Sequence, residues 1–344
     1  MTSVDDPRPG PGVPPPATTQ DGNAPSNRWA GGGGGRKGRG DGPTASYYGR
    51  PVLKAPVWKH YIPLYFFTGG LAGASSTLAL AAQMAGNDRL ARSARLASLA
   101  GTAASGPLLI ADLGRPGRFA NMLRVAKPTS PMSMGTWLLT AFAPSAIAAG
   151  ASDLTGLLPR LGRLCGAAAG VLGPGMTTYT AVLVSDTAIP AWHDAHRQLP
   201  FVFAGSSAAA AGGVAMACTP AASARPARRL ALVGACLELG ASRMMEQRLG
   251  QAGEPYRSGE AARLVKAAKM STTAGAVLAL AAGRRRLAAV PAGVLLAAGS
   301  LLTRLAVFRA GFESAADPGA TVGPQRRRRR WSDGLPGRPE DTSS

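Results

Sequence analysis

About eight blocks of roughly 20 residues, all between residues 62 and 308, are strongly apolar and almost free of charged side chains. The hydrocarbon core of a bilayer is about 30 Å thick, and an α-helix needs about 20 residues to cross it. We therefore predict an all-α integral membrane protein with about eight transmembrane helices, arranged as two four-helix bundles. The predicted spans are 62–85, 93–113, 132–151, 161–185, 199–218, 230–245, 268–282 and 287–308.

The apolar blocks lack the polar stripe that marks the surface helix of a soluble protein. The segment SSAAAAGGVAMAC, residues 206–218, consists largely of Ala and Gly on every face. Small residues of this kind let membrane helices approach each other closely. A soluble helical protein is therefore a poor explanation of the pattern.

The two ends of the chain have the opposite composition. Residues 1–45 are Pro, Gly and polar residues, and residues 313–344 include the run Arg326 to Arg330. Such segments bury too little apolar surface to offset the entropy of ordering them. We predict disordered tails at 1–45 and 313–344 around a membrane domain at 46–312. Because no folded nucleic-acid-binding domain surrounds the arginine run, we expect it to face solvent or lipid and to bind no nucleic acid.

Cysteine and histidine are scarce. Cys165, Cys218 and Cys236 lie singly in apolar blocks, without the paired spacing of cluster or zinc ligands. The three histidines, His60, His193 and His196, all lie outside the middle of the spans. The sequence therefore predicts a subunit without haem, iron–sulfur cluster or other metal.

The connections between spans differ on the two sides of the membrane. We call the side that carries the N-terminal tail face A; it also receives the connections 112–133, 186–201 and 246–269 and the C-terminal tail. Face B receives short basic turns. Aromatic, Pro, His and Asp residues concentrate on face A, so a site or partner is expected there. Lys and Arg near the span ends favour a cytoplasmic face A with both termini on that side.

Three segments carry a family resemblance. They are YYGRPVLKAPVWKHYIPLYFFTGGLAGAS (47–75), DLGRPGRFANMLRVAKPTSPMSMGTW (112–137) and YTAVLVSDTAIPAWHDAHRQLPFVFAGS (179–206). The D-L-G-R-P turn with the following K-P-T-S-P-M-S, and the G-G-L-A-G run of the first span, are its most specific parts. From about Tyr47 to Arg309 the chain resembles the NrfD family, the membrane subunits of polysulfide reductases.

The resemblance implies an eight-helix, haem-free anchor that interacts with a quinone, menaquinone or ubiquinone, in the cell membrane. It also implies two partners, an iron–sulfur (ferredoxin-like) subunit with four clusters and a molybdopterin catalytic subunit. Electrons would then pass between a cluster of the partner and a quinone held near face A. The lack of paired cysteines and of mid-span histidines agrees with this expectation.

Three residues are candidates for the quinone site. Asp112 ends the second predicted span, where an ionisable group is costly unless it is paired with another group or has a function. It would relay protons to the quinone or pair with Arg115 or Arg118. Tyr179 is the only tyrosine on the fourth span, and the family resemblance implies a tyrosine there that donates to a quinone carbonyl. A bond to a neighbouring helix is the alternative.

His60 precedes the first span. Its near-neutral pKa suits proton transfer and a hydrogen bond to a quinone oxygen. An ordinary histidine at the membrane interface is the competing interpretation.

A basic, partly aromatic surface on face A is the candidate docking site for the iron–sulfur subunit. Basic residues near a membrane also attract anionic lipid headgroups, so membrane lipid is the alternative partner. The candidate residues are Arg50, Lys54, Arg115, Arg118, Lys127, Trp192 and His193.

Two rival functions remain at the level of sequence. A secondary transporter would have helices broken near the midplane, and Gly173-Pro174-Gly175 in the fourth span is such a candidate break. The other rival is a purely structural anchor without a quinone site. Glu238 in the sixth span, which we expect to pair with Arg243, would serve structure or a proton path.

Overall fold

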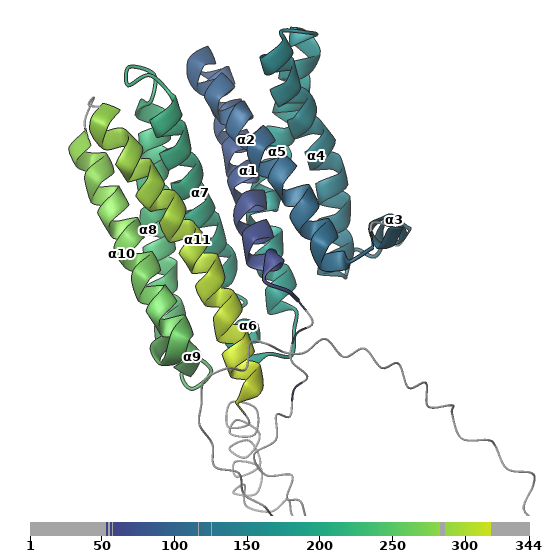
Figure 1. Cartoon of the computed structure of the whole chain (residues 1–344), viewed down its shortest axis with the longest axis vertical. Coiled ribbons are helices and arrows are strands. Elements are labelled where there is room, and N and C mark those ends of the chain that lie inside the picture. The colour runs from purple at the N-terminus through teal and green to yellow at the C-terminus, as the bar shows by residue number, and fades with distance from the viewer. Residues whose placement is uncertain are drawn as a thin grey trace, which may run out of the picture. The chain divides into compact units, whose positions relative to one another are not determined.

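A computed structural model describes residues 58–115, 117–124, 126–282 and 286–317, together with Leu53 and Pro56. These residues form eight long helices and three short ones (Figure 1). The long helices are α1 (Tyr61–Met84), α2 (Asp88–Leu113), α4 (Pro131–Thr155), α5 (Pro159–Ser185), α7 (Leu199–Cys218), α8 (Arg225–Arg248), α10 (Gly259–Ala282) and α11 (Arg286–Ala316). The short ones, α3 (Gly117–Leu123), α6 (Pro190–His193) and α9 (Glu254–Arg257), belong to the connections assigned to face A.

Local sequence sets several helix ends. Proline occupies the first turn of α4, α5, α7 and α8, where its missing N–H costs nothing. Gly114 and Gly156 end α2 and α4 in the left-handed conformation, with φ of 73° and 72°. The Asn87 side chain accepts the backbone N–H of Leu90 at 3.3 Å and caps the start of α2.

The long helices form two four-helix bundles (Figure 1). The first consists of α1, α2, α4 and α5, and the second of α7, α8, α10 and α11. They meet where α1 and α5 pack against α7 and where α1 packs against α11. The rings of Phe66 on α1 and Phe203 on α7, 6.1 Å apart, lie at this junction. The predicted helix class and bundle division are confirmed.

Small residues allow the close helix contacts. A Cβ added to Gly173 of α5 would lie 2.4 Å from the carbonyl oxygen of Gly73 on α1, so only glycine fits there. Pro174 has no N–H to bond the carbonyl of Gly170, and Thr77 Oγ1 of α1 donates to that carbonyl at 3.2 Å instead. Helix α5 is therefore continuous through Gly173-Pro174-Gly175, and the candidate break that would have suited a transporter does not form there.

Seven of the eight long helices are long and apolar enough to cross a membrane. The exception, α8, is the predicted span that Glu238 interrupts, and it carries arginines at both ends. Helix α11 continues to Ala316, past the boundary predicted at residue 312. The N-terminal tail and nearly all of the C-terminal tail lie outside the described residues.

Candidate functional site

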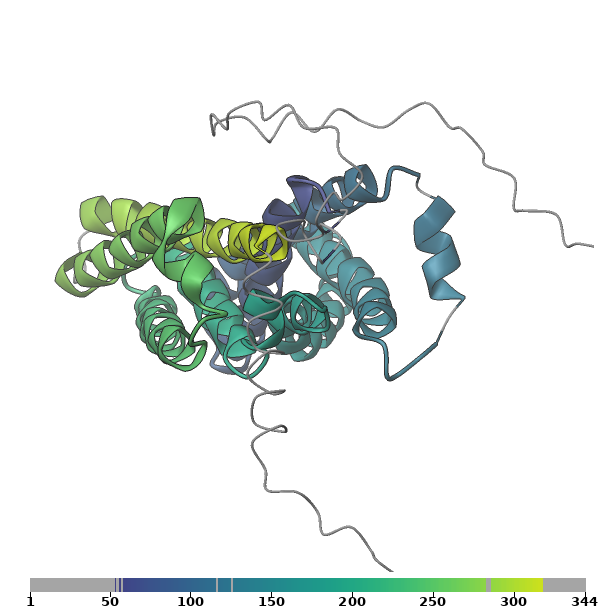
Figure 2. The same ribbon diagram turned by 90° about the horizontal axis from the view of Figure 1, so that it is seen from below.

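A cavity of about 100 Å³ lies in the first bundle, at the end that carries face A. Its walls are mostly apolar, and α3 contributes to them although it stands off from the long helices in the view from below (Figure 2). An apolar cavity of about 150 Å³ is known to bind benzene, so this one has the scale of a single ring. The lining residues are Trp58, Ile62, Tyr65, Phe66, Leu109, Asp112, Leu113, Phe119, Met122, Met132, Gly135, Thr136, Leu139, Tyr179 and Leu183.

Two tyrosines of the cavity wall form a pair through their hydroxyl groups. Tyr179 on α5 and Tyr65 on α1 are hydrogen-bonded to each other through their hydroxyl oxygens. Each hydroxyl has one hydrogen, so the bond between them uses only one of the two. The accepting tyrosine keeps a hydrogen that it can donate to a carbonyl oxygen in the cavity.

Gly135 of α4 makes room for the ring of Tyr179. A Cβ at this position would lie 2.6 Å from Cδ2 and 2.7 Å from Cε2 of that ring. Glycine therefore lets α4 pass directly over the tyrosine. Sequence analysis did not identify this role.

Tyr65 was not among the residues predicted from the sequence, although the sequence carries a signal for it. Tyr65 falls at helical spacing with Ile62, Phe66 and the glycines Gly69 and Gly73 of the G-G-L-A-G run, which mark the packed face of α1. Tyr65 is 5% exposed. A tyrosine on a glycine-rich, buried helix face needs a hydrogen-bond partner within the bundle.

Asp112 lies at the rim of the same cavity. It sits in the last turn of α2, which Gly114 ends, and the backbone N–H of Lys59 donates to its Oδ1 at 2.9 Å. Arg118 instead donates to the carbonyl of Leu113 at 2.9 Å. Among the described residues no cation lies within ion-pairing distance of Asp112, so the alternative pairing with Arg115 or Arg118 is not formed. The carboxylate is half-buried and ties the start of α1 to the end of α2.

His60 is not part of the cavity wall. Its ring packs against Tyr61, with ring centroids 4.1 Å apart, and its side chain is exposed. The structure thus brings Tyr179 and Asp112 together at one cavity and leaves His60 on the adjoining surface.

Trp192 requires a correction. It was expected to contact a partner protein, but its side chain is fully buried, and its Nε1 donates to the carbonyl of Val307 on α11 at 2.6 Å. Its ring stacks on that of Trp58 at 5.6 Å, and Trp58 lines the cavity. Trp192 therefore joins α6 to α11 and supports the cavity wall from behind.

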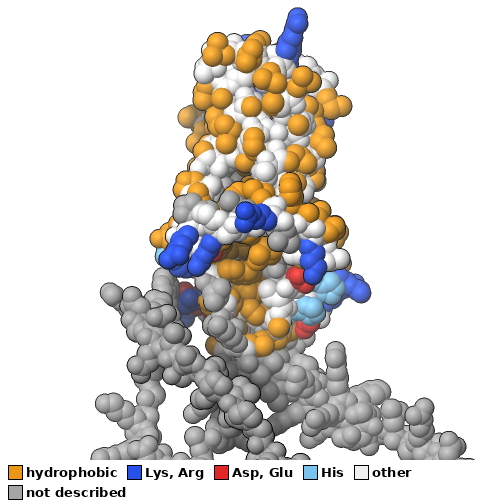
Figure 3. Space-filling model, turned by 90° about the vertical axis from the view of Figure 1, so that its right-hand side faces the viewer, with side chains coloured by type: hydrophobic (Ala, Val, Ile, Leu, Met, Phe, Trp, Pro, Cys, Tyr) orange, Lys and Arg blue, Asp and Glu red, His pale blue; other side chains and the backbone are white. Residues whose placement is uncertain are grey.

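The other docking candidates on face A are exposed where they are described. Arg115, Arg118, Lys127 and His193 all have exposed side chains, whereas Arg50 and Lys54 lie outside the described residues. Apolar side chains cover the helical wall, and Lys and Arg side chains gather in a band toward its lower end (Figure 3). This arrangement is typical of a membrane protein whose apolar belt ends at a basic interface.

Glu238 also requires a correction. We expected it to pair with Arg243, but Arg243 is exposed, and the buried Glu238 carboxylate accepts hydrogen bonds from Thr303 at 2.5 Å and Thr272 at 3.3 Å. Arg243 follows Glu238 by five residues, so the two point to different sides of α8. The buried cation close to Glu238 is Arg304 of α11.

Comparison with known proteins decides the family. The family model described as polysulphide reductase, NrfD, matches residues 51–231, more than half of the chain. The chain belongs to the NrfD family. The match spans the whole first bundle and every residue that lines the cavity, and it ends inside α8. No curated protein shows a significant match to the chain.

The NrfD assignment and the apolar helices together identify a multi-pass membrane protein. Within the part of the chain that the structure describes, no three His, Cys, Asp or Glu side chains are grouped so as to hold a metal ion. The polar groups that line the cavity of this NrfD protein include hydroxyl and carboxylate groups, which exchange hydrogen bonds and protons.

Proposed function

We propose that this chain is the quinone-interacting membrane subunit of a multi-subunit respiratory oxidoreductase. The observation that carries the proposal is the Tyr65–Tyr179 hydroxyl pair on the wall of an apolar, ring-sized cavity with Asp112 at its rim. Ligand sites of this type combine mostly apolar walls with a few convergent polar groups. The family assignment supports the same function.

The chemistry of a quinone fits these groups. Converting a quinone to a quinol adds two electrons and two protons at the carbonyl oxygens, and the reverse reaction removes them. A tyrosine hydroxyl can donate to a carbonyl oxygen, and the half-buried Asp112 can pass protons between face A and the cavity. The apolar walls exclude water and accept the quinone ring that carries the two carbonyl groups.

The electrons require a partner. The three cysteines of the sequence lie apart and offer no paired ligands for a cluster. An iron–sulfur subunit bound at face A would bring a cluster close to the cavity, and a molybdopterin subunit would complete the complex. The exposed cations Arg115, Arg118 and Lys127 lie on this side and suit an acidic protein surface or anionic lipid. We place face A on the cytoplasmic side of the cell membrane because of its Lys and Arg content.

Binding of a short-chain menaquinone or ubiquinone analogue to the full-length chain in lipid nanodiscs tests the proposal. We expect Tyr179→Phe and Tyr65→Phe each to weaken binding about five-fold, since one hydrogen bond to a neutral group contributes about 1 kcal/mol. Tyr61→Phe is the matched control, because it removes a hydroxyl at the same end of α1 that does not line the cavity. Unchanged affinity in a correctly folded Tyr65→Phe/Tyr179→Phe double variant would place the quinone site elsewhere, whereas no binding by the wild-type chain would favour a purely structural anchor.

A further inference from the structure

The second bundle contains two buried charged residues. Of the charged side chains that the structure describes, only Glu238 of α8 (2% exposed) and Arg304 of α11 (fully buried) are buried. Burying an ionisable group inside a membrane costs free energy, so such a group is a candidate for a functional role. Both residues lie beyond the segment that matches the NrfD family model, and neither lines the cavity of the first bundle.

The contacts of Glu238 suit both of its protonation states. Thr303 Oγ1 lies 2.5 Å from Oε1, and Thr272 Oγ1 lies 3.3 Å from Oε2. A threonine hydroxyl can donate to a carboxylate and, after rotation, accept from a protonated carboxyl. Neither neighbour is a cation that would fix the charged form in a direct ion pair. The site can therefore gain and lose a proton without losing its hydrogen bonds.

Arg304 supplies a fixed positive charge beside this site. Its guanidinium donates to Ser206 Oγ at 2.5 Å, to Ser207 Oγ at 2.8 Å and to the Phe203 carbonyl at 2.9 Å. It also lies 3.8 Å from the centre of the Phe203 ring. These acceptors are neutral, and its Nε has no acceptor in the described structure. In a poorly polarisable interior, the positive charge of Arg304 attracts the Glu238 carboxylate although the two groups form no direct ion pair.

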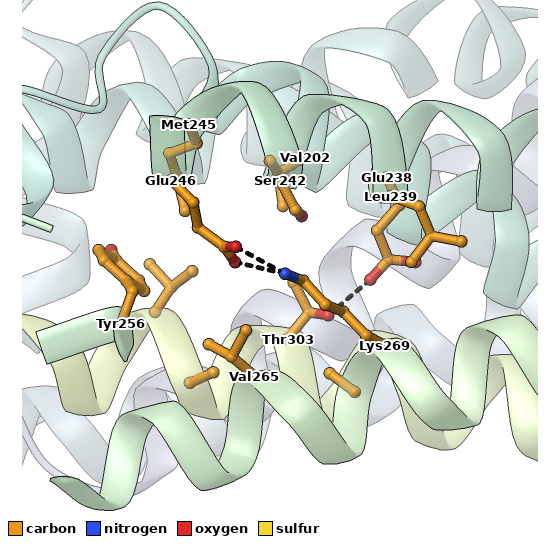
Figure 4. A pocket seen from close by; sticks show the side chains of 13 residues that line it. Val202, Glu238, Leu239, Ser242, Met245, Glu246, Tyr256, Val265, Lys269 and Thr303 are labelled. Atoms are coloured by element: carbon orange, nitrogen blue, oxygen red, sulfur yellow. Dashed lines mark hydrogen bonds and ion pairs between the residues drawn. The ribbon is translucent and has the colours of Figure 1, made fainter. Parts of the chain in front are cut away.

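A polar route connects Glu238 with face A. Ser242 and Glu246 follow Glu238 along α8 at intervals of four residues, so they share one side of the helix and lead toward its face A end. Glu246 is paired with Lys269 of α10, with N–O distances of 2.6 and 2.7 Å. Figure 4 shows this pair on one side and Glu238 with Thr303 on the other, around the same pocket.

The pocket has room for one water molecule. Its volume is about 20 Å³, whereas one water needs about 10–15 Å³ and two to four polar partners. Glu238, Ser242, Glu246 and Lys269 all line it and provide these partners. A groove of about 620 Å³ adjoins it, because Leu239, Glu246 and Lys269 line both. The groove also carries the exposed cations Arg243 and Arg257.

We propose that Glu238 is a proton-exchange site inside the membrane. It receives protons from face A through the Glu246–Lys269 pair and through a water molecule in the pocket between that pair and Glu238. A hydronium ion in the groove gives a proton to the Glu246 carboxylate and becomes water, and the proton passes through the water in the pocket to the Glu238 carboxylate. It returns by the same steps when the pH at face A rises. This site is separate from the cavity of the first bundle, so it does not rest on quinone binding.

Infrared difference spectroscopy of the full-length chain in lipid nanodiscs tests the proposal. We expect a carboxyl C=O band that grows as the pH falls, is absent in Glu238→Gln, and shifts in frequency in Thr303→Val, which removes one hydrogen bond but keeps the acid. After transfer to D₂O, the band should shift by deuterium exchange. Glu246→Gln and Lys269→Met should slow that exchange several-fold.

Glu260→Gln is the matched control. Glu260 pairs with Arg309 at face A but is more than half exposed and lines neither the pocket nor the groove. In Glu260→Gln, the carboxyl band of Glu238 should exchange with deuterium at the wild-type rate. A band that persists in Glu238→Gln, or that does not change with pH, would overturn the assignment of Glu238. Equal exchange rates in all variants would overturn the route. Because Glu246→Gln and Thr303→Val retain Glu238, the test stands even if Glu238→Gln does not fold.

Discussion

The hydroxyl groups of Tyr65 on α1 and Tyr179 on α5 are hydrogen-bonded to each other across 114 positions of sequence. Both tyrosines line one cavity near face A. Their bond links two helices and leaves one hydroxyl hydrogen for a ligand.

Gly135→Ala should weaken quinone binding by displacing the ring of Tyr179. The new Cβ would lie 2.6 Å from that ring, closer than side chains tolerate, so the tyrosine must move. Alanine otherwise favours a helix over glycine by about 0.5–1 kcal/mol, so helix propensity does not explain a loss. Affinity for a short-chain quinone in nanodiscs measures the effect.

Gly106→Ala serves as the control for this substitution. Gly106 lies inside α2, and a Cβ there meets no atom within 4 Å. Its affinity should stay at the wild-type value. If Gly135→Ala also binds normally, the position of Tyr179 does not determine binding.

Asp112→Asn should slow turnover of the assembled complex more than it changes the apparent affinity for a quinol analogue. Asparagine keeps the acceptor for the Lys59 N–H but cannot exchange a proton at neutral pH. Steady-state kinetics should show a lower kcat with little change in KM. Asp88→Asn, an exposed position at the start of α2 on face B, should behave as wild type. A normal kcat in Asp112→Asn would exclude Asp112 from proton transfer.

Trp192→Phe should destabilise the membrane domain by about 1–3 kcal/mol, because the buried carbonyl of Val307 loses its donor. Thermal unfolding in detergent measures the loss. Trp137→Phe, at a position that is 45% exposed, should cost less. Equal unfolding temperatures for both variants would contradict the structural role of Trp192.

The sequence predicts helices here better than it predicts contacts. Helix positions follow from local hydropathy, so all eight long helices could be read from it, although α10 begins at Gly259 and not at residue 268 as predicted. Side-chain partners depend on how each helix is rotated against segments far away in the chain. The partners of Glu238 and the burial of Trp192 were therefore predicted wrongly, and Tyr65 was missed.

In the candidate site, too, single residues could be predicted from the sequence but their contacts could not. Asp112 was proposed because an acid at a span end is conspicuous locally, whereas Tyr179 was proposed because the family resemblance implies a tyrosine on this span. The Lys59 N–H that binds Asp112 belongs to a segment 53 residues away, which no local pattern indicates. Arg304 lies within a predicted span, where a charged residue is itself a signal of function or pairing.

Reversing the charges of Arg118 and Lys127 together should weaken binding of an iron–sulfur partner at face A. Both side chains are exposed, so opposite charges there would repel an acidic surface without disturbing the core. Co-purification in mild detergent at physiological salt measures the interaction. Arg225→Glu/Arg229→Glu makes the same charge change on exposed residues of face B and should leave the complex intact. Survival of the complex in both variants would assign the cations of face A to lipid.

The most direct test of the central claim is to map where a photoreactive quinone analogue attaches to the full-length chain in lipid nanodiscs. We expect labelled peptides to contain residues of the cavity wall, such as Tyr65, Met122 and Tyr179, and unlabelled quinone to compete for them. Gly135→Ala should reduce this labelling. Labelling confined to other helices, or labelling that excess quinone does not displace, would contradict a quinone site in the cavity that Tyr65 and Tyr179 line.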